Sequence, residues 1–137
     1  MKFEESNYFN TLKPHKITMP YGDFYFCEKF YLAEINEGIH LDYDKLISLM
    51  IELVGYYGKD RKIGFISNRI NPYSLDPHVY NKIDQEFNMI AASAYVVYSD
   101  LSYMNATIEK RFTKKSLKRC ISIEEAVDWI LNIKELN

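Results

Sequence analysis

The sequence predicts an α/β protein with a mixed, mostly parallel sheet of about five strands, an N-terminal β-hairpin and four helices. Strand-like and helix-like segments alternate from residue 21 to the end of the chain. Helices between successive strands imply right-handed crossovers, and therefore parallel pairing of those strands. The segment 90–98 has no polar face, which is typical of a strand covered on both sides. We therefore expect Val96 and Val97 to be buried in a central strand.

The other strands are shorter. Segments 23–27 and 30–36 are apolar, flank a two-residue connection, and are typical of a hairpin. The hairpin makes one strand antiparallel to the rest. Segment 62–67 predicts the third strand, with Ile66 in the core, and segment 117–121 predicts the fifth.

Each expected helix follows a residue that caps helix N-termini well. The second helix has proline at its first position, and Glu125 can form a capping box with the residue that opens the last helix. In the third helix, helical spacing places four apolar residues on one stripe: Leu101, Met104, Ile108 and Phe112. The four capping residues are Asp42, Asp76, Ser99 and Ser122.

Length and composition indicate one domain, because 137 residues suffice for a single core. Residues 1–20 are polar, contain two prolines, and are expected to form a partly ordered lead-in arm with at most one short strand; residues 21–137 are expected to form the domain. A formal charge of −2 argues against a nucleic-acid coat or a polybasic membrane anchor. No apolar run suits a signal core or a membrane span, so we expect a cytoplasmic protein. Cys27 and Cys120 are expected to be reduced and buried.

Ligands of open sheets gather beyond the C-terminal ends of the strands. That rule selects the loops 36–42, 67–76, 99–101 and 121–122. Arg69 is suited to pair with a phosphate or a carboxylate; alternatively it pairs with Glu37 or Asp76, while the loop asparagines and serines serve the backbone. The candidate binding residues of this rim are Asn36, Ser67, Asn68, Arg69, Asn71, Ser99 and Asp100.

Segment 110–119 carries the strongest local charge, with six basic residues in ten and no acidic one. It suits an acidic protein, a phosphorylated ligand or an anionic surface. Alternatively its cations complement a helix C-terminus and protect an edge strand. The basic residues are Lys110, Arg111, Lys114, Lys115, Lys118 and Arg119.

The sequence contains no strong pattern for a metal site or a catalytic site. His40, Asp42 and Asp44 alternate along one loop, but Asp42 is needed as a helix cap and known ligand spacings are absent. No serine or cysteine lies in a nucleophile motif beside a histidine. We therefore expect no metal, no cofactor and no catalytic residue.

Three segments carry a resemblance: residues 33–38 (AEINEG), 64–69 (GFISNR) and 122–129 (SIEEAVDW). With the order of the elements, they resemble small bacterial STAS/SpoIIAA-like proteins over residues 21–133, in a branch common in Bacteroidota. The resemblance implies a non-catalytic binding module with a phosphorylatable serine or threonine after the third strand. Ser67 holds the matching place, although no aspartate precedes it, and Ser74 lies later in the same loop.

We therefore expect a non-enzymatic, STAS-like interaction or regulatory module that binds a protein partner, a second copy of itself included, and no nucleic acid. The alternatives are a small-ligand or lipid-binding domain and an enzyme acting at the rim. A filled core favours the module, an apolar cavity of several hundred Å3 favours ligand binding, and a buried acid–base pair favours catalysis.

Overall fold

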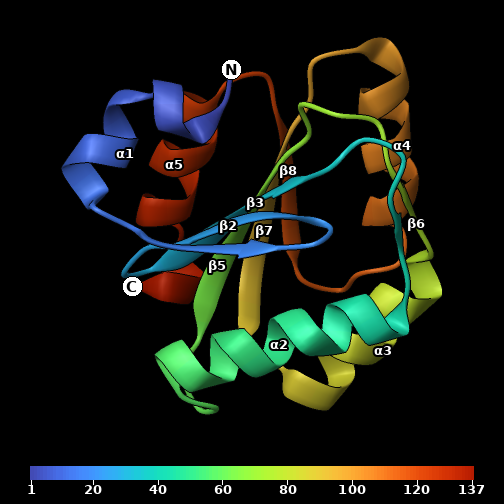
Figure 1. The fold of residues 1–137 in the computed structure, drawn as a ribbon, viewed down its shortest axis with the longest axis horizontal. Helices are drawn as coiled ribbons and strands as arrows, with labels where there is room; N and C mark the ends of the chain where they lie inside the picture. The colour runs from blue at the N-terminus through green and yellow to red at the C-terminus, as the bar shows by residue number, and fades with distance from the viewer.

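The structure is a computed structural model that describes all residues from 1 to 137. A six-stranded sheet forms its centre, in the order β1-β2-β3-β5-β7-β8 (Figure 1). Its strands are β1 (His15–Met19), β2 (Gly22–Phe26), β3 (Phe30–Ile35), β5 (Ile63–Asn68), β7 (Ile90–Val96) and β8 (Ser116–Cys120). The helices are η1 (Phe3–Glu5), α1 (Asn7–Leu12), α2 (Tyr43–Tyr57), α3 (Pro77–Phe87), α4 (Asp100–Lys110), α5 (Ile123–Asn132) and η2 (Lys134–Leu136).

The sheet is mixed and mostly parallel, as the sequence predicts. Strand β2 runs antiparallel to both β1 and β3, whereas β3, β5, β7 and β8 are parallel to one another. The counts differ slightly from the prediction, which had about five strands and four helices. The additional elements are β1, α1, the short helices η1 and η2, and a separate two-stranded parallel ladder of β4 (His40–Leu41) and β6 (Ser74–Leu75).

Helices cover both faces of the sheet (Figure 1). Side chains of α2, α3 and α4 join one apolar cluster, and those of η1 and α5 join the other. Val96 ends β7, Val97 follows it, and both are buried, which confirms the expected double cover. Ile66 of β5 is fully buried, and Cys27 and Cys120 are free and buried.

The predicted helix caps are present. The side chains of Asp42, Asp76, Ser99 and Ser122 each accept a hydrogen bond from a backbone N–H in the first turn. One detail differs: the Glu125 carboxylate accepts from the N–H of Ile121, at 2.8 Å, rather than from that of Ser122. No helix is both long enough and apolar enough to cross a membrane.

The first 20 residues are more ordered than their polar composition predicts. They form η1, α1 and the edge strand β1, which pairs with β2. Phe3 is fully buried and contacts the rings of Phe9 and Tyr25. These aromatic contacts anchor the segment, because a buried aromatic side chain removes a large apolar area from water.

Helix α4 turns its apolar stripe away from the core. Leu101, Met104 and Ile108 are 67%, 60% and 49% exposed, and Ala106 is the buried residue of the helix. Phe112, the fourth residue of the predicted stripe, lies beyond the end of the helix, is half-buried and contacts the His78 ring. An amphipathic helix normally buries such a stripe. Here the small Ala106 side packs on the core, which leaves the larger apolar side chains in solvent.

Candidate functional site

A groove of about 610 Å3 opens at the C-terminal end of the parallel strands, between segment 69–77 and α4. Apolar side chains alternate around it with amides and hydroxyls, including Ile70, Leu101, Asn105 and Ile108. Arg69 and Glu109 are the only charged residues that line it, and they neutralise each other. The groove therefore suits an uncharged, partly apolar surface.

Arg69 pairs with Glu109 of α4. Both guanidinium Nη atoms donate to the carboxylate, one of them at 2.8 Å, and the two side chains are 8% and 12% exposed. The guanidinium also lies 4.0 Å from the centre of the Tyr95 ring. Burial disfavours the charge, but Tyr73 and Glu109 favour it more strongly, so the pKa of Arg69 lies above its ordinary value.

This geometry changes the role expected of Arg69. The predicted structural partners, Glu37 and Asp76, are wrong, because the partner lies 40 residues along the chain in α4. A guanidinium already bound by two carboxylate oxygens has few donors left for an external anion. Arg69 therefore fixes α4 against the end of β5.

Ser67 and Asn68 lie on opposite faces of β5 and are both buried. The Ser67 hydroxyl accepts a hydrogen bond from Nε of Arg69 at 3.2 Å and lies 3.1 Å from the Tyr73 hydroxyl. Asn68 donates to Glu34 at 2.7 Å and accepts from the Tyr98 hydroxyl at 2.6 Å. Strand alternation separates them, so they belong to two different polar clusters.

Glu34 is a buried carboxylate that sequence analysis missed. Its Oε2 accepts from the Phe3 N–H at 2.7 Å as well as from Asn68, which ties the N-terminal segment to the sheet. Burial raises the pKa of Glu34, although the hydrogen bonds from Phe3 and Asn68 oppose that effect. The available signal was a lone carboxylate within the otherwise apolar strand β3.

The other rim candidates are mainly structural. Asn36 donates to the carbonyl of Pro20 and Asn71 to that of Ile35. Ser99 caps α4, whereas Asp100 is exposed in its first turn. Of these candidates, Asn71 and Ser99 line the groove.

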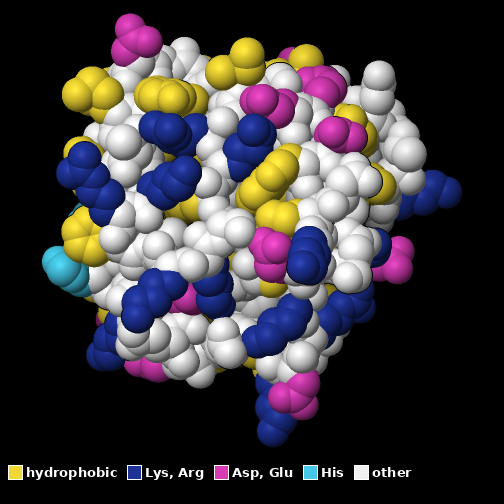
Figure 2. Space-filling model, turned by 180° about the vertical axis from the view of Figure 1, so that it is seen from behind, with side chains coloured by type: hydrophobic (Ala, Val, Ile, Leu, Met, Phe, Trp, Pro, Cys, Tyr) yellow, Lys and Arg dark blue, Asp and Glu magenta, His cyan; other side chains and the backbone are white.

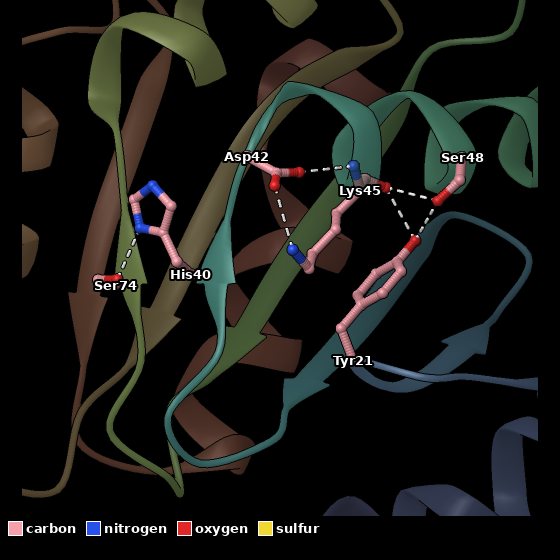
Figure 3. Close-up of polar contacts among 6 residues, drawn as sticks. All are labelled: Tyr21, His40, Asp42, Lys45, Ser48 and Ser74. Carbon is pink, nitrogen blue, oxygen red and sulfur yellow. Dashed lines mark hydrogen bonds and ion pairs between the residues drawn. The ribbon is translucent and has the colours of Figure 1, made fainter.

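Ser74 and His40 face each other across the β4–β6 ladder (Figure 3). The Ser74 hydroxyl lies 2.7 Å from Nδ1 of His40, and both residues are exposed. Asp42 is bonded to the backbone N–H and Nζ of Lys45 and not to His40. The N–H of Lys45 and its ammonium lower the pKa of Asp42. The pair thus lacks the third group that orients a catalytic histidine.

The predicted basic residues divide into two groups. Lys115 pairs with Asp84 at 2.9 Å, and Arg119 donates to Thr107 and lies over the Tyr103 ring. The remaining four make no ion pair within the chain: Lys110, Arg111, Lys114 and Lys118. Lys and Arg side chains are numerous on the left of Figure 2, the side on which α4 lies in that view.

Only small spaces separate the helices from the sheet. Three of them, of about 10, 30 and 20 Å3, adjoin Tyr80, whose buried hydroxyl has no hydrogen-bond partner. Such volumes hold one or two water molecules at most. No group of three or more His, Cys, Asp or Glu side chains is arranged to hold a metal ion.

The sequence matches no family model, and no curated protein matches it either. The structure is similar to the crystal structure of an uncharacterised DUF3478-family protein with a SpoIIAA-like fold from Shewanella loihica PV-4. The TM-score is 0.53 at 14% identity, over 85% of this chain and 91% of that one. The protein therefore has a STAS/SpoIIAA-like fold, as the resemblance implied; the Bacteroidota branch stays a prediction.

Proposed function

We propose that this protein is a non-enzymatic, cytoplasmic regulatory module of the STAS type, which binds a protein partner in the groove between segment 69–77 and α4. The neutral, partly apolar character of the groove carries the proposal. The filled core supports a binding surface over an internal ligand pocket, because the spaces behind the helices hold only water-sized volumes.

A protein suits this groove better than a small molecule does. Pockets for small ligands usually bury most of the ligand surface. Here Leu101 and Ile108 on the α4 wall are largely exposed, so a small ligand would leave them in water. A protein partner is large enough to cover both walls together.

Ser74 is the better of the two serines for a phosphate switch. It is exposed on the groove wall, whereas Ser67 is buried under Arg69 and Tyr73. A phosphate would add about two negative charges at neutral pH. Because Arg69 is bound to Glu109, the groove lining offers no free cation to neutralise them, and His40, which contacts Ser74, lies outside that lining. Phosphorylation of Ser74 would therefore weaken the binding of an apolar partner.

The test is an affinity capture from native cytosol, followed by a binding titration with the captured protein. Asn105→Trp fills the groove from an exposed position, and Glu124→Trp on α5 is the matched control. We expect Asn105→Trp and Ser74→Asp to weaken binding at least tenfold, and Glu124→Trp to leave it unchanged. Equal binding by all variants would contradict the groove. A turnover activity lost in both Ser74→Ala and His40→Ala would replace the proposal with an enzyme.

A further inference from the structure

The exposed apolar stripe of α4 consists of Leu101, Met104 and Ile108. Its members are spaced by three and four residues, which is the spacing of the seam in paired helices. No other part of the chain covers this stripe, because the helix rests on the core through Ala106. The stripe has the form of one half of a helix–helix contact.

We propose that two copies of the chain associate through this stripe, with their α4 helices antiparallel about a two-fold axis. In that register Met104 packs against Ile108 of the second copy, and the same contact repeats on the other side of the axis. The aliphatic part of Arg111, the next seam position, lies over Leu101 of the second copy. All four seam positions are then covered.

The charges at the two ends of α4 select the antiparallel arrangement. Asp100 is the first residue of the helix and Arg111 is its C-cap, and neither takes part in an ion pair within the chain. An antiparallel pair places each Asp100 beside Arg111 of the other copy. A parallel pair would place like charges together and align the two helix dipoles unfavourably.

The contact is small. Helix α4 has 11 residues, about 16 Å of helix, which is less surface than a stable dimer interface usually buries. We therefore expect a reversible dimer that depends on protein concentration. Leu101 and Ile108 belong to both the stripe and the groove, so self-association competes with the proposed partner. The inference does not depend on that partner.

Sedimentation of the full chain over a concentration series tests the contact. Asp100→Arg and Arg111→Asp should each raise the dissociation constant about tenfold or more, and the double swap should restore dimerisation. If the single swaps acted only through the dipole of α4 itself, the double swap would weaken dimerisation further. It would place an unfavourable charge at both ends of the helix. Glu124→Arg, with the same change of charge on α5, is the control. A chain that stays monomeric up to about 1 mM, or a dimer indifferent to both swaps, overturns the proposal.

Cysteine cross-linking tests the orientation. A mixture of Met104→Cys and Ile108→Cys proteins should form a disulfide-linked pair on mild oxidation, whereas each variant alone should not. In the antiparallel register equal positions are offset by four residues, about 6 Å along the axis, beyond the reach of a disulfide. The native Cys27 and Cys120 are buried and therefore inaccessible for cross-linking, and burial also raises the pKa of each thiol. Efficient self-linking of either single variant overturns the antiparallel dimer. The absence of a disulfide-linked pair in the mixture overturns it too.

Discussion

Removal of the Glu109 carboxylate should destabilise the protein strongly. In Glu109→Ala the Arg69 guanidinium stays under the Tyr95 ring, 4.0 Å from its centre, without an anionic partner. The two side chains are only 8% and 12% exposed in the native protein, so water that enters from the groove solvates the guanidinium less well than the lost carboxylate does. Breaking a buried pair in this way costs about 3–5 kcal/mol, or about 10–20 °C in melting temperature for a chain of this size.

Urea unfolding of the wild type and three variants measures the effect. Replacement of both partners, as in Arg69→Met with Glu109→Leu, should come within about 1 kcal/mol of the wild type, because no unpaired charge remains. Glu52→Ala on the exposed face of α2 is the control and should change stability by less than about 0.5 kcal/mol. A loss below about 1 kcal/mol in Glu109→Ala would refute the reasoning, since it would mean that the pair is solvated. A double variant as unstable as the single one would refute it too.

Four further results are expected. Ile66→Ala should cost about 2–5 kcal/mol in urea unfolding, because the side chain is fully buried; a loss under about 0.5 kcal/mol would place β5 outside the core. Phe3→Ala should cost about 3–5 kcal/mol and make residues 1–12 sensitive to limited proteolysis. Cleavage of the wild type within residues 1–12 would contradict the anchoring of this segment by Phe3. The pKa of Glu34 is raised by burial, so the folded state binds the extra proton, and stability relative to Glu34→Gln should fall as pH rises from the ordinary carboxyl pKa through the raised one; parallel pH profiles would contradict this. Ser74→Ala should leave the melting temperature within about 2 °C of the wild type, because Ser74 and His40 are both exposed; a large loss would make their contact structural.

Local patterns account for the parts of the fold that were predicted well. Four helix starts follow from single capping residues, because a cap acts on the backbone beside it. The double cover of β7 follows from an uninterrupted apolar run. These signals are contained within a few neighbouring residues, so no knowledge of tertiary contacts was needed.

The parts that were not predicted depend on contacts between distant segments. Arg69 lies in a loop that offered nearby carboxylates, yet its partner Glu109 is on α4. Phe3 is surrounded by polar residues in sequence, and only its packing on Tyr25 makes it core. Helical periodicity reports that a helix has an apolar side, but it does not say whether this protein or another molecule covers that side.

Helix α4 is held to the rest of the molecule mainly by polar contacts, and this explains how its apolar stripe stays free. The Arg69–Glu109 pair fixes one side of the helix to the end of β5, and Arg119 of β8 donates to Thr107 on another. The apolar anchor between them is only Ala106. A helix attached in this way does not need to bury its large apolar side chains in the core. They remain available to line the groove and to contact a partner. Because the Arg69–Glu109 pair attaches the α4 wall of the groove to the end of β5, its loss should weaken partner binding, measured by titration, even in variants whose stability has been restored by substitution elsewhere.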